Sequence, residues 1–422
     1  MISIKKIRER PEFIAKKLLS KNDKTDIKHL LKIDNELRNL KTRSSELRSS
    51  RNSASESIAL IKKNGEDPSY AIKQTKNIGE ELKDVEKELG RVENEFKYIM
   101  ERIPNTPHDS VPTGENESEN IFVREWGEKK VYDFTLKNHL ELGKNLNLFD
   151  FKRGAKLSGS GFPLYLGKGA ELERKLINSM LDYHIHNFDF KEISPSVLIN
   201  KESMQTTGQL PKFQDDMYHT EVDNLYLAPT AEVPITSFHR NEILNESDLP
   251  LKYVGYTPCF RRESGSYGKD TRGLLRVHQF NKVELVEFTT PDKSFDQLEA
   301  LTLQAETILQ KLGLHYRVIE LCSGDLSFSA SKCYDIELWA PAEQKWLEVS
   351  SCSNFESFQA RRGNIKYRID ENKKLDFVHT INGSGLATPR LVVALIETYQ
   401  NSEGIVQFPE EVSSFLGIKE LS

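Results

Sequence analysis

CFRRESGSYGKDTRGLLRVHQFNKVE, residues 259–284, is the stretch of this 422-residue chain that decides its fold and its chemistry. Two segments with the alternating pattern of β-strands flank a loop that carries Gly265, Gly268 and Gly273. Because alternate residues of a strand share a face, one surface of the predicted hairpin collects charged and aromatic side chains. These side chains are Arg261, Glu263, Arg276, His278, Phe280, Lys282 and Glu284.

This surface has the chemistry to bind a nucleotide. Buried charges need partners or a ligand, and an arginine fork matches a phosphate or a carboxylate. A phenylalanine ring stacks on adenine, and the loop glycines let the backbone approach phosphates. Any one of these residues alone fits an ordinary hairpin with a polar face. The set as a whole favours a ligand site.

The first hundred residues carry a different signal. Apolar residues recur at spacings of three and four from Leu30 to Ile61 and again from Ala71 to Ile103, the pattern of a coiled coil. Asn64, Gly65 and Pro68 lie between the two stripes, where a turn reverses the chain. We expect an antiparallel helical hairpin over about 27–103, within an N-terminal domain of residues 1–104. Its first helix is basic, yet a solvated coil that spaces domains would look similar.

Prolines and a polar stretch end this hairpin and predict a linker over residues 105–124. From about residue 125 to residue 422, strand and helix patterns alternate, with predicted strands at 251–263, 273–289, 315–320, 333–340 and 345–351. Strands in hairpin order with helices at the ends predict an α+β domain built on an antiparallel sheet.

Motifs in this second domain resemble those of class II aminoacyl-tRNA synthetases, in the form used by bacterial-type seryl-tRNA synthetases. Residues 259–284 resemble motif 2, and the segment that ends at Pro195 resembles motif 1, which builds the dimer interface of class II enzymes. TTGQLPKF (206–213) and LAPTAEVP (227–234) resemble segments before the serine pocket. LEVSSCSNFESFQARR (347–362) resembles the metal and ATP strand, and NGSGLATPR (382–390) resembles motif 3. The N-terminal helical hairpin is a family feature as well, so the resemblance spans nearly the whole chain.

The resemblance implies an activity and a set of site residues. The enzyme would activate L-serine with ATP and transfer the seryl group to tRNA(Ser), and to tRNA(Sec) where that pathway exists. Serine contacts would come from Thr230, Ala231, Glu232, Arg261, Glu284, Asn382 and Ser384. ATP contacts would come from Arg261, Arg262, Glu263, Val277, Phe280, Glu348, Val349, Ser350, Ser351 and Arg390.

Within those sets the resemblance implies particular roles. Arg261, Glu348 and Arg390 would be catalytic, with Arg261 bridging the serine carboxylate and the α-phosphate. Glu348 and Ser351 would hold Mg²⁺, although they share a face only if a bulge interrupts their strand. Thr230 and Glu232 would share a face if their segment is extended.

Composition sets further expectations. Net charge is −5, so any RNA contact must come from a local basic surface. No apolar run reaches the roughly 20 residues needed to span a bilayer, and the charged N-terminus is no secretory signal. The four cysteines form no CxxC pair, so we expect no zinc and reduced thiols. Together these features favour a cytoplasmic protein with no membrane segment, and the resemblance to motif 1 implies a homodimer formed around Pro195.

Three other interpretations compete with this one. A ligase of the same fold that loads a carrier protein would lack the long arm. A non-catalytic synthetase-like RNA-binding protein would have lost one of Arg261, Glu284, Glu348 or Arg390, and all are present. A coiled-coil interaction protein with an unrelated globular end would not carry the motifs in order.

Overall fold

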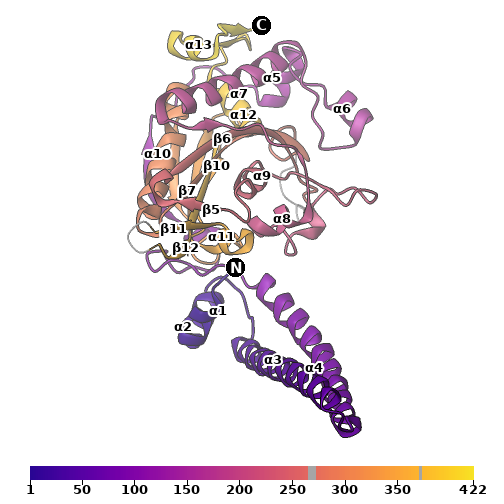
Figure 1. The fold of residues 1–422 in the computed structure, drawn as a ribbon. Helices are drawn as coiled ribbons and strands as arrows, with labels where there is room; N and C mark the ends of the chain where they lie inside the picture. The colour runs from indigo at the N-terminus through magenta and orange to yellow at the C-terminus, as the bar shows by residue number, and fades with distance from the viewer. Residues whose placement is uncertain (265–271, 370–372) are drawn as a thin grey trace. The chain divides into compact units, whose positions relative to one another are not determined.

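The computed structural model describes residues 1–264, 272–369 and 373–422. It divides into two compact units (Figure 1). One comprises Ile2–Leu19 and Asp23–Ile103; the other comprises Met1, Ser20–Asn22 and Pro104–Ser422. Gly265 and Gly268 of the glycine-rich loop lie outside the described residues.

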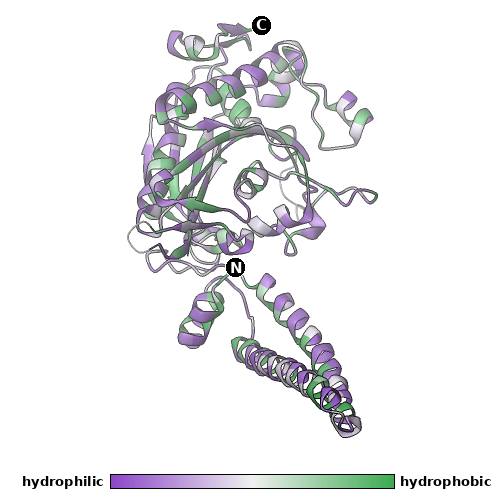
Figure 2. Cartoon of the chain, viewed as in Figure 1, coloured by the Kyte–Doolittle hydropathy of each residue, from purple (hydrophilic) through white to green (hydrophobic). Residues whose placement is uncertain are grey.

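The first unit is helical. Its elements are α1 (Ile4–Glu9), α2 (Pro11–Leu19), α3 (Ile27–Lys63) and α4 (Ser69–Arg102). The Asp26 side chain accepts a hydrogen bond from the His29 amide and caps α3. Ile33, Leu37 and Val92 form a buried cluster between α3 and α4. The predicted antiparallel hairpin is therefore present, and its long helices are coloured largely hydrophilic in Figure 2.

Ion pairs reinforce the hairpin and neutralise part of its basic helix. Lys41 Nζ lies 3.0 Å from Glu93 Oε1, and Arg48 Nη2 lies 2.7 Å from Glu86 Oε1. Arg43 pairs with Glu81 in the same way. These side chains are exposed, so each pair contributes only about 0–1 kcal/mol.

An eight-stranded sheet forms the second unit. Its strand order is β1-β8-β9-β10-β13-β7-β6-β2, and every neighbouring pair is antiparallel except β6 with β2. The strands are β1 (Ile121–Trp126), β2 (Lys191–Glu192), β6 (Leu251–Phe260), β7 (Gln279–Thr289), β8 (Tyr316–Glu320), β9 (Lys332–Ala340), β10 (Lys345–Asn354) and β13 (His379–Ala387). The expected α+β fold with an antiparallel sheet is confirmed.

Three helices pack on this sheet through a common apolar core. They are α7 (Gly167–Phe188), α10 (Ser294–Lys311) and α12 (Thr388–Thr398). Leu176 of α7, Ile308 of α10 and Leu395 of α12 are fully buried in that core, together with Val283 and Leu285 of β7. The face of β7 that carries Glu284 is thereby left for other contacts. In Figure 1, β6 and β7 lie between α10 and α9.

Shorter elements complete the unit. The helices are α5 (His139–Asn145), α6 (Phe151–Ser158), α8 (Lys201–Thr207), α9 (Glu232–Ser237), α11 (Phe358–Gly363) and α13 (Glu410–Leu416). The small sheets contain β3 (Leu198–Ile199), β4 (Tyr226–Leu227), β5 (Ile243–Asn245), β11 (Lys366–Arg368), β12 (Leu375–Phe377), β14 (Val406–Gln407) and β15 (Glu420–Leu421). No helix of the described ranges is both long and apolar enough to cross a membrane.

The predicted hairpin strands were too long. β6 ends at Phe260 and β7 begins at Gln279, so Arg261, Glu263 and Arg276 lie beyond the strand ends. Glu263 has φ +52° and Gly273 has φ +60°. A residue in this left-handed region cannot continue a strand. The backbone therefore turns at residues whose alternating sequence pattern predicts a strand.

Candidate active site

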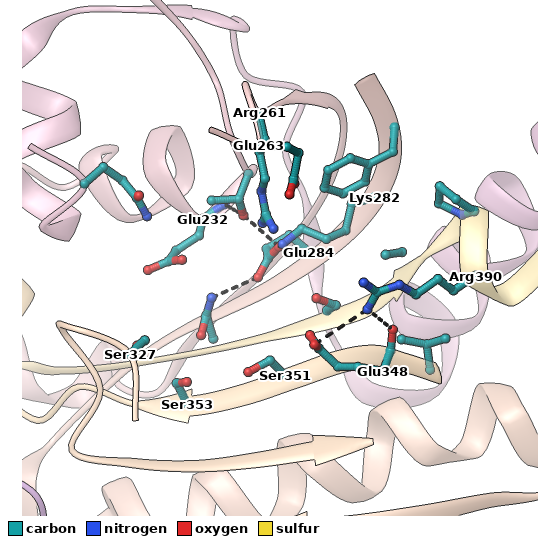
Figure 3. A pocket seen from close by; sticks show the side chains of 18 of the residues that line it. Glu232, Arg261, Glu263, Lys282, Glu284, Ser327, Glu348, Ser351, Ser353 and Arg390 are labelled. Carbon is teal, nitrogen blue, oxygen red and sulfur yellow. Dashed lines mark hydrogen bonds and ion pairs between the residues drawn. The ribbon is translucent and has the colours of Figure 1, made fainter. Parts of the chain in front are cut away.

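A cavity of about 410 Å³ opens on the face of β7 that carries Glu284, and its charged lining is balanced (Figure 3). Four carboxylates and four cations line it: Glu232, Glu263, Glu284 and Glu348 with Arg261, Arg276, Lys282 and Arg390. Phe280, Lys282 and Glu284 alternate along β7 and share the face that sequence alternation predicts.

Glu284 is the most heavily bonded group of the cavity. It is fully buried and accepts hydrogen bonds from Thr230 Oγ1 at 3.0 Å and from Asn382 Nδ2 at 2.9 Å. Lys282 Nζ lies 2.5 Å from its Oε2. Ser384 faces Glu284 across the β7–β13 ladder and also lines the cavity. Three chain segments, namely the one around Thr230, β7 and β13, thus supply the partners of this carboxylate.

Glu232 supplies a second buried carboxylate. It begins α9, and its amide donates to Thr230 Oγ1 at 3.1 Å. The condition under which alternation would put Thr230 and Glu232 on one face, an extended segment, is not met, although both residues line the cavity. Burial, and next the charge of Glu284, raises the pKa of Glu232 to about 7. A cation placed beside Glu232 would favour the ionised form of this carboxyl.

Arg261 enters the same cavity as Glu284. Its Nε donates to the Pro229 carbonyl at 3.2 Å, and its guanidinium lies 5.1 Å from the Phe280 ring centroid. Its amide donates to the His278 carbonyl at 2.9 Å. Figure 3 shows the Arg261 side chain directed toward Glu284. His278 itself turns away from the predicted face, because its ring stacks on Phe162 at 5.2 Å.

The other end of the cavity is built around Arg390. Its Nε donates to the Leu275 carbonyl at 3.1 Å, and its Nη1 donates to the Glu348 carbonyl at 2.9 Å. The Glu348 carboxylate lies 3.6 Å from the same nitrogen. Glu263 pairs with Arg276 nearby. These contacts hold the Arg390 guanidinium at the cavity wall, and Phe280 and Val277 also line the cavity.

The bulge that Glu348 and Ser351 require is present. Glu348 pairs with Glu337 and Ser350 pairs with Ile336, so the β9–β10 register shifts between Glu348 and Ser350. The shift brings Glu348 and Ser351 to the same cavity. A carboxylate and a hydroxyl are hard oxygen donors of the kind that Mg²⁺ prefers, so the donor set fits this ion.

The remaining predicted site residues divide into two groups. Val349 and Asn382 line the cavity. Ala231, Arg262 and Ser350 are not among its lining residues: Ala231 is fully buried in a neighbouring apolar cluster, and the Ser350 hydroxyl donates to the Ser384 carbonyl at 2.7 Å. The Arg262 amide donates to the Asp216 carbonyl at 3.0 Å.

Sequence reasoning missed several lining residues. Gln209, Ser327, Phe328 and Ser353 also border the cavity. Gln209 lies within TTGQLPKF and Ser353 within LEVSSCSNFESFQARR, so the motifs covered these two without assigning them a role. Ser327 and Phe328 precede β9 in a segment without any periodic or motif signal.

A second charged cluster lies beside Gly273 and Leu274. His139, Glu343 and Glu397 place ligand atoms within 4.8 Å of one another. The Leu274 amide donates to His139 Nε2 at 3.3 Å, so the neutral ring carries its proton on Nδ1. Nδ1 lies 3.2 Å from Glu343 Oε1 and 3.6 Å from Glu397 Oε1. The nitrogen that faces the carboxylates is therefore protonated and not free to bind a metal.

Two family models match the chain. Residues 1–107 match the seryl-tRNA synthetase N-terminal domain, and residues 213–399 match the tRNA synthetase class II core domain (G, H, P, S and T). A serine–tRNA ligase from Pelodictyon phaeoclathratiforme is 51% identical over 427 residues, covering 100% of this chain and 99% of the relative. One from Chlorobium phaeobacteroides is 51% identical over 398 residues, covering 94% of this chain and 92% of the relative.

Solved structures agree with these sequence matches. The chain resembles the seryl-tRNA synthetase from Pyrococcus horikoshii complexed with ATP, with a TM-score of 0.91, 36% identity, and coverage of 100% of this chain and 99% of that one. It also resembles the cytoplasmic serine–tRNA ligase from Naegleria fowleri in complex with AMP, with a TM-score of 0.84, 27% identity, and coverage of 98% and 96%. With this fold, this cavity and full-length relatives at about half identity, the chain belongs to the seryl-tRNA synthetase family of class II aminoacyl-tRNA synthetases.

Proposed function

We propose that the cavity joins L-serine to ATP as seryl-adenylate and then passes the seryl group to tRNA(Ser). The observation that carries this proposal is the convergence of Thr230, Lys282 and Asn382 on the buried carboxylate of Glu284, in the same cavity as Arg261. One end thus suits a small zwitterion with a hydroxyl, and the other suits a nucleotide.

Each polar group of serine would contact a side chain of the cavity. Glu232 and Thr230 accept from the ammonium group, while Glu284 and Ser384 pair the side-chain hydroxyl. Asn382 orients Glu284 through its 2.9 Å hydrogen bond. Arg261 faces the carboxylate of serine. Alanine would leave Glu284 and its neighbours without the hydroxyl, and a buried group left unpaired costs roughly 10⁴ to 10⁵ in specificity.

ATP would occupy the Arg390 end. Phe280 and Arg390 stack on opposite faces of adenine, and Glu263 and the Val277 backbone bond its edge. Glu348 and Ser351 hold Mg²⁺, which when bound neutralises charge on the triphosphate. The remaining predicted ATP contacts, Arg262, Val349 and Ser350, complete the proposed set; of these, Val349 lines the cavity.

The first step needs no general base. The serine carboxylate is ionised at neutral pH, so its oxygen attacks the α-phosphorus and pyrophosphate leaves with the bonding electrons. Arg261 stabilises the charge that develops on the α-phosphate, and the cavity holds both substrates in line. In the second step the terminal ribose hydroxyl of tRNA attacks the seryl carbonyl and AMP leaves. The adenylate phosphate could accept the hydroxyl proton.

We assign tRNA recognition to the helical hairpin. Arg51, Lys62 and Lys63 of α3 are exposed and form no ion pair with any residue of the described ranges. Free cations on a long arm suit the phosphates of an extended RNA helix. The same surface would serve tRNA(Sec) where that tRNA exists. The proposed N-terminal tRNA-binding domain is residues 1–104, followed by a linker over 105–124 and the catalytic domain over 125–422.

Assembly and location complete the proposal. β2 lies at one edge of the large sheet, just before Pro195. We propose that this motif 1 segment forms the interface of a homodimer and that the enzyme works in the cytoplasm. Sedimentation of the purified protein tests the dimer, which predicts a mass of about twice 48.4 kDa.

Two experiments test whether the cavity forms the adenylate and the helical hairpin recognises tRNA. Arg261→Ala should lower ATP–pyrophosphate exchange about 10²- to 10³-fold, the usual loss for one charge-stabilising group. Arg153→Ala, an exposed cation of α6, is the matched control and should retain exchange. Deleting residues 30–100 should leave exchange intact and abolish tRNA charging. Charging that survives the deletion would refute the role of the arm.

A further inference from the structure

A chain of buried hydrogen bonds runs from the sheet to Glu232. Thr380 of β13 donates from Oγ1 to Gln359 Oε1 at 2.7 Å, and Gln359 of α11 donates from Nε2 to Glu232 Oε1 at 2.6 Å. Thr380 and Gln359 are fully buried, and Glu232 is 7% exposed. Glu232 lines the cavity, whereas Gln359 and Thr380 lie behind it.

When Glu232 is ionised, as serine binding requires, chemistry fixes the direction of each bond. An ionised carboxylate only accepts hydrogen bonds, so the amide nitrogen of Gln359 must face Glu232. The amide oxygen then faces Thr380, whose hydroxyl donates to it. With the amide turned over, its oxygen would lie against the carboxylate of Glu232, and two acceptors would meet in a buried place. The Thr380 hydroxyl therefore helps to select the one productive amide orientation.

This chain of hydrogen bonds stabilises the carboxylate of Glu232, whose surroundings disfavour a negative charge. Its carboxylate is buried, and the carboxylate of Glu284 shares the same cavity. Like charges repel across such a site, and the buried cation nearest to Glu284 is already paired with it: Lys282 lies 2.5 Å from Glu284 Oε2. The amide of Gln359 is the neutral donor that fixes one oxygen of Glu232.

Rigid surroundings hold Gln359 in place. Its sequence neighbours Phe358 and Ala360 are buried. The Phe355 amide donates to the Thr380 carbonyl at 3.0 Å, and the Thr380 amide donates to the Glu356 carbonyl at 3.2 Å. The turn before α11 is thus tied by two backbone bonds to Thr380, the residue that donates to Gln359. A side chain locked in this way can orient a binding group within a fraction of an ångström.

From this arrangement we infer that Gln359 is a positioning residue for amino-acid recognition. It holds the carboxylate of Glu232 in the orientation that receives the ammonium group of serine, and Thr380 sets the amide of Gln359. The inference rests on the proposed function, in which Glu232 binds that ammonium group. Gln359 is not among the residues that line the cavity and reaches it through Glu232, so its effect should be confined to serine.

ATP–pyrophosphate exchange on the full-length enzyme tests this inference, with KM for serine and KM for ATP measured separately. Gln359→Met keeps the length of the side chain but removes its donor. It should raise KM for serine about 10- to 100-fold, the usual effect of removing a hydrogen bond to a charged group. KM for ATP should stay within about twofold. Thr380→Val should raise KM for serine by a smaller factor, and Thr380→Ser, which keeps the hydroxyl, should behave as wild type.

Glu232→Gln and thermal melting separate the possible failures. A raised KM for serine in Glu232→Gln, with no change in Gln359→Met, would overturn the inference and leave the proposed role of Glu232 intact. An unchanged KM for serine in Glu232→Gln would instead overturn that role. Equal changes of both KM values in Gln359→Met, accompanied by a lowered Tm, would show a purely structural residue. If Gln359→Met does not fold, the nearly isosteric Thr380→Val provides the test. Its KM for serine is then compared with its KM for ATP in the same way.

Discussion

Acid should weaken serine recognition before it affects ATP recognition. Burial, and then the neighbouring charge of Glu284, raises the pKa of Glu232 to about 7 in the ligand-free protein. The carboxylate is thus about 90% ionised at pH 8 and about 10% ionised at pH 6. Only the ionised form attracts the ammonium group of serine. We therefore expect kcat/KM for serine to fall about tenfold from pH 8 to pH 6.

ATP–pyrophosphate exchange at saturating ATP, with serine varied at each pH, measures this dependence. KM for ATP over the same pH range is the internal control, because Glu232 lies at the serine end of the cavity. Glu232→Gln should bind serine poorly at every pH and lose the step near pH 7. A step that persists unchanged in Glu232→Gln, or one centred below pH 5.5 in the wild type, would refute the reasoning.

The raised pKa of Glu232 also makes the stability of the folded protein depend on pH. A carboxyl whose folded pKa is raised favours the folded state most when it is protonated. Its contribution is full below the ordinary value of about 4.5 and is lost as the pH rises through about 7. Bound serine should offset that loss, since its ammonium group stabilises the ionised form. Serine should therefore raise Tm more at pH 8 than at pH 6, and equal increments at both pH values would contradict this linkage.

Three further predictions concern other parts of the molecule. Gly273→Ala should raise KM for ATP and destabilise the protein by about 2–3 kcal/mol. The reason is that φ is +60° at this position and the added Cβ would lie 2.1 Å from His139 Nε2. Gly65→Ala, which is also at positive φ but in open space, should cost only about 1 kcal/mol. Ser351→Ala should raise the Mg²⁺ concentration needed for half-maximal exchange and leave KM for serine unchanged, and a changed KM for serine would contradict its assignment. The double variant Lys62→Ala with Lys63→Ala should raise KM for tRNA and lower the salt slope of tRNA binding by about 1 per lost phosphate contact, while exchange without tRNA stays constant.

Local pattern predicted the elements whose periodicity extends over many residues. The heptads predicted the α3–α4 hairpin, and alternation placed Phe280, Lys282 and Glu284 on one face of β7. The need for Glu348 and Ser351 to share a cavity predicted the bulge between them. In each case one geometric rule acts along a single segment, and the sequence of that segment is sufficient.

Features that depend on distant partners could not be read in this way. Glu263 adopts φ +52° three residues after β6 ends at Phe260, and alternation carries no signal for that turn. Thr230 and Glu232 reach the cavity from a helix start rather than from a strand. Gln359 is 127 residues from Glu232 and 21 from Thr380, so only the folded chain reveals their hydrogen-bonded chain.

ATP–pyrophosphate exchange with serine, threonine, alanine and glycine, in the wild type and in Glu284→Gln, tests most directly whether one cavity reads a hydroxylated amino acid beside a nucleotide. The wild type should exchange with serine at least 10⁴-fold more efficiently than with alanine, and Glu284→Gln should lose most of that preference. An enzyme that exchanges equally well with alanine, or a Glu284→Gln variant that keeps full preference for serine, would contradict the assignment.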